Sequence, residues 1–234
     1  MKKHCFLVRV ALLIASLALI TTAQKLEETP EELAKAAYKA HGGEKLRNLK
    51  SLEVYGTVDV TTSALAQAIP GSFAMIISGD RYLLTIQTPI QSIKQVFDGK
   101  QTQSTIPQFA LPPVNSLGFP LLARLGQPGI SIGPAAKKGR GFRLTAPDGF
   151  YTDFYLDSKT GLIKSFESAY EVYGRKLVTV AEVDKNQVVE GITIPQRYSQ
   201  RFELGTITAY SDFKAKEIKV NSLIDDKVFS LSSN

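Results

Sequence analysis

Few side chains in this sequence have the type and spacing that catalysis needs. Residues 129–133 spell the G-x-S-x-G pattern of a nucleophile elbow, with Ser131 at its centre. That motif requires a strand before it, a helix after it and a histidine downstream. Here Pro128 and Pro134 flank the motif, and His41 lies upstream. We therefore interpret the segment as a turn or a short strand rich in glycine and proline.

A metal site at His41 and Glu44, three residues apart, is a second candidate. A zinc site needs three or four ligands. The other histidine and the single cysteine, His4 and Cys5, both lie near the N-terminus. A histidine at a helix end more often interacts with the helix dipole than with a metal. The sequence therefore predicts no metal and no cofactor.

Charged clusters give no clearer sign of enzymatic activity. Asp153 and Asp157 have no hydrolase context, and Asp225-Asp226 is typical of a turn. Residues 137–140 are mostly basic but match no phosphate-binding loop. A solvated turn explains them, and contact with a lipid headgroup or an anionic partner is the alternative. We expect a protein that is not an enzyme.

The N-terminus resembles an export signal. Lys2, Lys3 and Arg9 precede an apolar run from Val10 to Ile20, and small residues follow up to Ala23. We predict cleavage near Ala23 and a periplasmic location; an uncleaved N-terminal anchor is the alternative. The apolar run is too short for an integral membrane span.

Cleavage would change the charge of the protein. The formal net charge of +6 includes Lys2, Lys3 and Arg9, so half of it leaves with the signal. The remaining charge argues against a nucleic-acid partner. Residues 24–234 are expected to form a single domain, and no disulfide is available to it because Cys5 is removed.

The first predicted element after the signal is a helix. Thr29 is placed as N-cap, Pro30 as first helical residue and Glu32 as the partner in a capping box. Gly42-Gly43 provides the stop, and a short second turn over 44–49 follows. The small residues of this helix are expected to pack on a sheet.

From residue 49 onward, apolar residues alternate with polar ones, which predicts strands. Turns at Gly79-Asp80 and Asp98-Gly99 predict two hairpins. Further strands are predicted at 141–146, 151–156, 162–170, 176–183, 192–204 and 206–218. About ten strands joined by turns indicate a mainly β (α+β) fold with antiparallel pairing.

Residues 106–136 interrupt this pattern with six of the eleven prolines and many apolar side chains. The prolines disfavour a regular strand or a long helix, whereas the apolar content disfavours a solvated linker. A short kinked helix over 115–125 is expected. The segment is either a lid over an apolar interior or a fixed loop that covers the core.

Several phrases of the sequence resemble the LolA, LolB and LppX-like superfamily of outer-membrane lipoprotein-sorting proteins. They are residues 38–43 with Leu46, 49–52 and Gly56, then 155–157, 160–162, 189–195, 218–221, Asp225-Asp226 and Phe229. The resemblance implies a strongly curved antiparallel sheet, or half-barrel, whose apolar concave face holds acyl chains under a cover. In such carriers a buried arginine ties the lid, and Arg81 or Arg124 is the candidate here.

Strand alternation and the Pro-rich segment predict the residues that contact a ligand. The wall is expected to consist of Phe73, Met75, Ile77, Tyr82, Leu84 and Ile86, and the cover of Leu117, Phe119, Leu121 and Leu122.

We expect a periplasmic carrier or binding protein for a hydrophobic small molecule, a lipid or a lipoprotein acyl chain. The alternative is a regulatory or scaffolding module with a filled core that binds another envelope protein. A cavity of several hundred cubic ångströms would favour the carrier.

Overall fold

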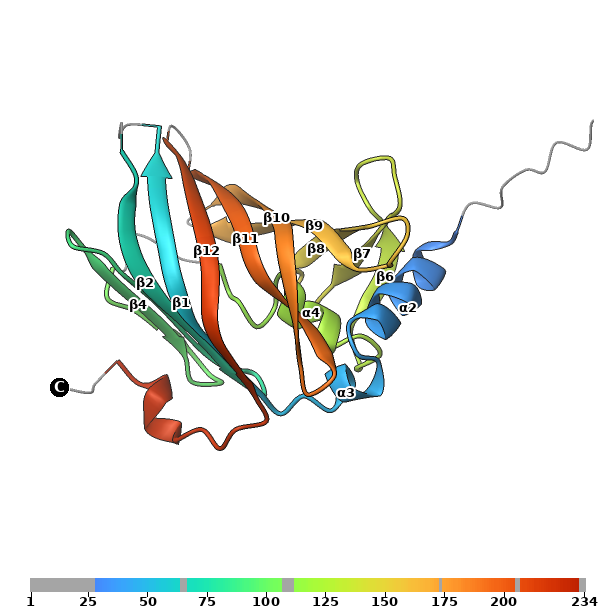
Figure 1. The fold of residues 1–234 in the computed structure, drawn as a ribbon, viewed down its shortest axis with the longest axis horizontal. Coiled ribbons are helices and arrows are strands. Elements are labelled where there is room, and N and C mark those ends of the chain that lie inside the picture. The colour runs from blue at the N-terminus through green and yellow to red at the C-terminus, as the bar shows by residue number, and fades with distance from the viewer. Residues whose placement is uncertain (1–27, 64–66, 107–111, 173, 205–206, 232–234) are drawn as a thin grey trace, which may run out of the picture.

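A computed structural model describes residues 28–63, 67–106, 112–172, 174–204 and 207–231. Within these ranges twelve strands form one sheet in the order β5-β4-β3-β2-β1-β12-β11-β10-β9-β8-β7-β6, and all neighbours are antiparallel (Figure 1). The strands are β1 Ser51–Thr62, β2 Ile69–Ser78, β3 Arg81–Gln87, β4 Ser92–Phe97, β5 Thr102–Ser104, β6 Ser131–Pro134, β7 Gly141–Thr145, β8 Tyr151–Leu156, β9 Ile163–Val172, β10 Arg175–Val189, β11 Ile192–Leu204 and β12 Ile207–Val220. The helices are α2 Pro30–Ala40, α3 Glu44–Arg47, α4 Phe119–Ala123 and the 3-10 helix η1 Asp226–Phe229. The predicted signal lies outside the described residues.

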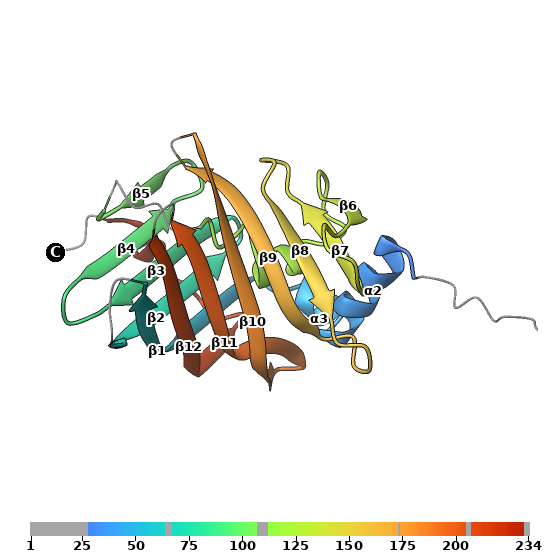
Figure 2. The same ribbon diagram turned by 90° about the horizontal axis from the view of Figure 1, so that it is seen from above.

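Helix α2 begins as its sequence predicts. The Thr29 hydroxyl accepts a hydrogen bond from the Glu32 amide at 3.2 Å, and the Glu32 carboxylate accepts one from the Thr29 amide at 2.8 Å. The helix ends before Gly42, whose φ of +121° favours glycine. Its buried residues are Leu33, Ala34 and Ala37, and α2 packs against β6 and β7 (Figure 2).

The predicted hairpin around Gly79-Asp80 is confirmed with its register. Phe73 lies opposite Ile86, Met75 opposite Leu84 and Ile77 opposite Tyr82. These are the six residues predicted as the wall, so they share one face of β2 and β3. The hairpin at Asp98-Gly99 is also present and joins β4 to β5.

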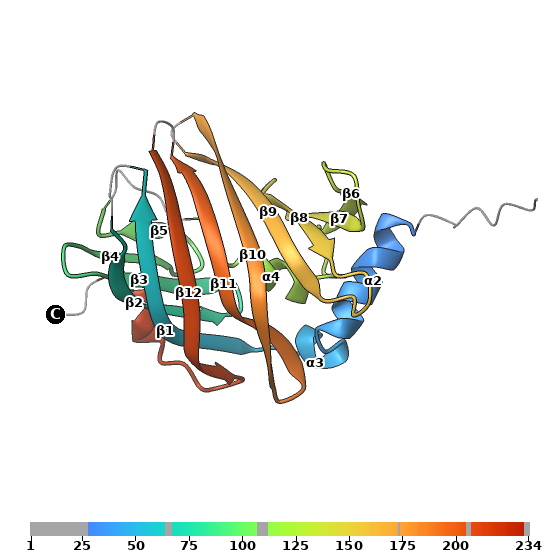
Figure 3. The ribbon, with the colours of Figure 1, turned by 45° about the horizontal axis from the view of Figure 1, so that its top comes forward.

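The sheet is strongly curved and open, as the half-barrel expectation requires (Figure 3). Register shifts occur in β1 between Tyr55 and Gly56, and in β10 between Val183 and Asn186. Such bulges bend a strand and increase its twist. The two edge strands, β5 and β6, are not paired with one another.

Strand β6 is the short strand expected as one alternative for 129–133, and it corrects the broader expectation that prolines disfavour a regular strand within 106–136. Ser131–Pro134 pairs with β7, opposite Phe142 to Thr145. Because β6 is the last strand in the sheet, the missing N–H of Pro134 costs no pairing on the outer side. With this strand the described residues form twelve strands, where about ten were expected.

Two apolar clusters lie on opposite faces of the sheet. The larger one fills the concave face and includes residues of α2, α4 and most strands. The smaller one consists of Ile76, Leu83 and Val96 on the other face, covered by Phe229 of η1. The C-terminal segment therefore covers the outside of β2 to β4 (Figure 1).

In the described part of the chain, no helix has the length and apolarity to cross a membrane.

Candidate functional site

The chain topology places the Pro-rich segment over the concave face. Strands β5 and β6 follow one another in sequence but lie at opposite edges of the sheet. The connection between them must therefore cross the opening of the half-barrel. It carries α4, which packs against the inner face behind β10 and β11 in Figure 1. We call residues 112–127 the cover.

The four predicted cover residues are all buried. Leu121 and Leu122 have no exposed surface and pack into the main core with Phe119. Leu117 and Phe119 line a cavity between the cover and the sheet. Leu121 and Leu122 do not line this cavity, so they hold the cover in place.

This cavity is apolar and measures about 90 Å³. The sheet contributes Leu52, Val54, Met75, Phe166, Ser168, Thr179, Ile194, Pro195, Tyr198 and Gln200, and the cover contributes Pro112, Val114, Leu117, Gly118, Phe119 and Pro120. Of the six predicted wall residues, Met75 lines it, while Phe73, Ile77 and Ile86 belong to the surrounding core. Tyr82 and Leu84 are buried on the same sheet face without lining it. Contact between a ligand and any of the six predicted wall residues stays a prediction.

Sequence reasoning missed the wall residues from the centre of the sheet. Leu52 and Val54 of β1 and Ile194 of β11 alternate with polar residues, which was a usable signal. Phe166, between Ser165 and Glu167, and Tyr198, between Arg197 and Ser199, carried the same signal. Only the pairing across β9 to β12 shows that they line one cavity.

The cavity is small in this structure. Pockets for small molecules span roughly 300 to 1,000 Å³, and an engineered cavity of about 150 Å³ holds benzene. At about 90 Å³, the space is too small for an acyl chain. A ligand of that size would have to displace the cover.

Hydrogen bonds attach the cover to the sheet on both sides. The Gly118 amide donates to the Thr152 hydroxyl at 3.0 Å, and the Ser116 hydroxyl donates to Asp148 at 2.9 Å. On the other side, the Asn115 amide nitrogen donates to the Asp80 carbonyl at 2.6 Å. We call these three contacts the latches.

Of the two arginines considered as lid ties, Arg124 lies within the cover and faces Asp80 in the turn between β2 and β3. Its Nη1 donates to the Asn115 carbonyl at 3.5 Å, and its Nη2 lies 3.8 Å from the Asp80 carboxylate. Arg81 instead bonds Asp226 at 2.7 Å and lies over the Phe229 ring at 4.7 Å. Arg81 therefore fastens the C-terminal segment on the outer face and has no part in the cover.

A second cavity of about 280 Å³ lies at one end of the half-barrel. We call it the mouth. It is bounded by the end of α3, the start of β1, the turn between β2 and β3, and the residues after α4. Its charged lining residues are Arg47, Lys50, Arg124 and Asp80. Leu52 and Pro120 line both the mouth and the apolar cavity, so the two spaces adjoin.

His41 is buried between α2, β9 and β11. Its Nδ1 lies 2.6 Å from the Thr193 carbonyl, and the Ile163 amide donates to its Nε2 at 3.0 Å. These partners require the neutral ring with its proton on Nδ1. Burial lowers the pKa of His41, against the opposing effect of the Thr193 carbonyl. His41 therefore links three elements and is not the exposed dipole partner that its position predicts.

The other candidate chemical groups have structural partners. Asp153 is buried and forms a bidentate ion pair with Arg143 at 2.7 and 2.8 Å. Asp157 accepts hydrogen bonds from the Thr160 amide and hydroxyl, both at 2.8 Å. Ser131 is exposed on the edge strand β6. Among the described residues, no three histidine, cysteine or acidic side chains are grouped to hold a metal.

The hydroxyl of Tyr198, which lines the apolar cavity, has a strongly shifted pKa. Burial raises the pKa of its hydroxyl well above 10, so the side chain stays neutral. Its ring stacks on Phe213 with centroids 4.9 Å apart, and Phe213 meets Phe73 edge-on at 5.0 Å. These rings form a rigid apolar wall.

Comparison with solved structures identifies the fold. No family model and no curated protein matches the sequence. A LolA superfamily protein from Nitrosomonas europaea is 15% identical, with 87% of this chain and 98% of that chain covered and a TM-score of 0.50. Also similar are a DUF1329 family protein from Desulfovibrio piger (9% identical, 88% and 98% covered, TM-score 0.47) and a putative outer membrane lipoprotein-sorting protein domain from Vibrio parahaemolyticus (8%, 86% and 97%, 0.46). The first match confirms, at the level of the fold, the resemblance to LolA-type proteins.

Proposed function

We propose that this LolA-like half-barrel is an exported, periplasmic carrier or binding protein for a hydrophobic ligand. The ligand would be a lipid, a lipoprotein acyl chain or another hydrophobic small molecule. The observation that supports this function is an apolar cavity on the concave face, enclosed by a cover that hydrogen bonds attach to the sheet. The proposed function needs no catalytic residue.

The energetics allow a ligand to open the cover. Each methylene group removed from water contributes about 0.8 kcal/mol, so half of a sixteen-carbon chain provides roughly 6 kcal/mol before ordering costs. A hydrogen bond contributes about 1 kcal/mol net, so the three latches together contribute roughly 3 kcal/mol, about half of that amount. An acyl chain can then replace Leu117 and Phe119 against the wall, provided that the cover moves.

The small volume of the cavity favours one alternative. A space of about 90 Å³ is also what a largely filled core would leave. In that case the protein would be a regulatory or scaffolding module that binds another envelope protein through its surface. The two functions differ in whether the concave face accepts a ligand.

Native mass spectrometry of the periplasmic product distinguishes them. The full chain is expressed in a Gram-negative host, and the purified protein is weighed before and after denaturation. The carrier function predicts a mass that begins at Gln24 and a bound species of lipid mass that leaves on denaturation. A clean unbound mass, together with no response to added fatty acids or hydrophobic dyes, would favour the protein-binding module.

A pair of variants links any bound species to the cavity. Val54→Phe adds a ring to the cavity wall, whereas Val188→Phe adds the same ring at a position that is 66% exposed on β10. The carrier function predicts that Val54→Phe reduces the bound fraction severalfold while Val188→Phe leaves it unchanged. Equal loading of both variants would place the adhering lipid elsewhere.

A further inference from the structure

The mouth carries more positive than negative side chains. Arg47, Lys50 and Arg124 line it, and Asp80 is its acidic lining residue. These residues come from three separate places in the sequence, around 47–50, 80 and 124, so only the folded chain gathers them. Glu44 lies next to Arg47, and positive charge remains in excess when Glu44 is counted as well.

The three cations are weakly engaged with protein partners. Arg47 lies 3.2 Å from Glu44, but both side chains are more than half exposed, at 51% and 69%. Arg124 reaches Asp80 only at 3.8 Å, and its hydrogen bonds go to neutral acceptors, the Asn115 carbonyl at 3.5 Å and the Gln127 side chain at 3.3 Å. Within the described ranges, Lys50 has an exposed side chain without an ion pair or hydrogen bond. An incoming anion would therefore displace few existing contacts.

The mouth opens directly onto the apolar cavity. Leu52 at the start of β1 and Pro120 in α4 line both spaces. A molecule with its polar end in the mouth would extend its chain past these two residues toward Met75 and Tyr198. The arrangement of charge followed by hydrocarbon matches an amphiphile and not a plain hydrocarbon.

We infer that the mouth binds the anionic headgroup of an acyl amphiphile, a carboxylate or a phosphate, while the acyl chain occupies the cavity beneath the cover. This inference rests on the proposed function and specifies its ligand class. It separates anionic lipids from uncharged acyl groups, which would gain nothing from Arg47 and Lys50.

The electrostatic contribution should be modest and sensitive to salt. An exposed ion pair contributes little by itself, and an apolar wall on one side strengthens it by lowering the local dielectric constant. Charges at the rim are screened over about 8 Å at physiological ionic strength. The preference for an anionic headgroup should therefore fall as salt is added, while binding of the acyl chain persists.

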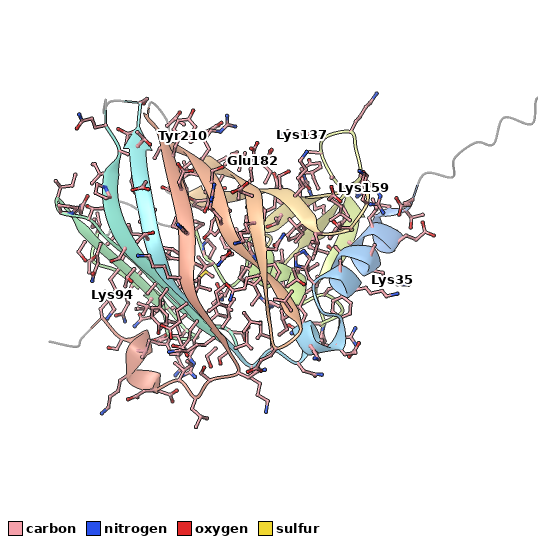
Figure 4. The ribbon with its side chains drawn as sticks, in the orientation of Figure 1. Lys35, Lys94, Lys137, Lys159, Glu182 and Tyr210 are labelled. Atoms are coloured by element: carbon pink, nitrogen blue, oxygen red, sulfur yellow. The ribbon has the colours of Figure 1, made fainter. Side chains whose placement is uncertain are left out.

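The test compares lipids with one chain length and different headgroups. Binding of a fatty acid, a lysophosphatidylglycerol, a lysophosphatidylcholine and a monoacylglycerol is measured below their micelle-forming concentrations by competition with a fluorescent fatty-acid probe. Three versions of the full chain are used: wild type, Lys50→Glu and the control Lys35→Glu. Lys35 is exposed on α2, where its side chain points away from the sheet (Figure 4), so the control makes the same charge change outside the mouth.

Wild type is expected to bind the two anionic lipids about tenfold more tightly than the monoacylglycerol, which corresponds to roughly 1.4 kcal/mol. Lys50→Glu should remove most of this preference without weakening monoacylglycerol binding, and Lys35→Glu should retain it. A double variant, Arg47→Gln with Lys50→Gln, should reproduce the loss without introducing a new negative charge. A preference for the fatty acid alone would identify a carboxylate site, and one for the lysophosphatidylglycerol alone a phosphate site.

Two other outcomes have distinct meanings. Equal affinity for charged and uncharged lipids in wild type, or an equal effect of Lys50→Glu and Lys35→Glu, would overturn the headgroup site and leave the carrier function standing. Absence of binding by all four lipids would overturn both.

Discussion

The His41 side chain shows how one buried residue connects distant parts of the chain. Its ring bonds the Thr193 carbonyl and the Ile163 amide, and its backbone amide donates to the Ala37 carbonyl at 3.0 Å. The Phe119 ring of the cover lies 5.3 Å from the imidazole. His41 therefore joins α2 to two strands at a point where the cover also packs.

The lowered pKa of His41 gives a defined dependence of stability on pH. The unfolded chain, with a histidine pKa near 6.5, binds a proton more readily than the folded protein. Stability from the neutral ring is therefore complete above about pH 7 and declines as the pH falls below 6.5 toward the folded-state pKa.

His41→Asn should lower the free energy of unfolding by about 3 kcal/mol at pH 8, because the Ile163 amide loses its acceptor and the ring leaves a void. The difference from wild type should shrink as the pH falls from 6.5 to 5. Urea unfolding at four pH values measures it. A difference that stays constant over this range would contradict a neutral, buried His41.

At the scale of the element, Gly56 shows why β1 bends where it does. A Cβ at this position would lie 2.1 Å from the Lys214 carbonyl oxygen and 2.8 Å from the Phe73 ring. Only glycine permits β1 and β12 to approach this closely at the register shift. The bend helps to shape the concave face to which Val54 and Phe73 belong.

Gly56→Ala should lower the free energy of unfolding by about 3 kcal/mol and the melting temperature by about 10 °C. Gly133→Ala in β6 is the matched control, since no described atom lies within 4 Å of its added Cβ. The control should stay within about 0.5 kcal/mol of wild type. Thermal unfolding followed by circular dichroism compares the two, and similar melting temperatures would show that β12 shifts to make room.

At the scale of the whole molecule, the connection across the opening ties ligand access to the stability of the cover. The sheet is held by continuous backbone pairing, whereas the cover adds short helical turns and a few latches. Segments with few backbone partners open at lower free energy than the strands around them. The cover is therefore the part that a ligand would displace first.

Thr152→Val tests this difference, because it removes the acceptor of the Gly118 amide at nearly constant volume. Amides of residues 118–126 should exchange with deuterium about tenfold faster, which is the effect of one hydrogen bond, while β10 and β11 stay protected. Thr179→Val is the control: Thr179 is equally buried and accepts from Gln200 at 2.7 Å, within the sheet. Mass spectrometry of the exchanged protein measures both. Equal exchange of the cover in the two variants would mean that the Gly118 latch does not hold it.

Local signals in the sequence by themselves determined the helix start, the hairpins and the antiparallel fold class. The capping box at Thr29 and the turns at Gly79-Asp80 and Asp98-Gly99 act through neighbours within a few residues, so the chain order alone specifies them. The alternation in β2 and β3 likewise predicted which six residues share a face.

Tertiary structure alone decided what that face encloses. The position of β6 at the sheet edge, the small volume of the cavity, about 90 Å³, and the position of Arg124 beside Asp80 follow from contacts between segments far apart in the sequence. The same holds for the mouth, where Arg47, Lys50 and Arg124 meet. The alternation of apolar and polar residues indicates which side chains are buried. The pairing of β1 with β12 and the path of the cover determine which of these buried side chains face one another.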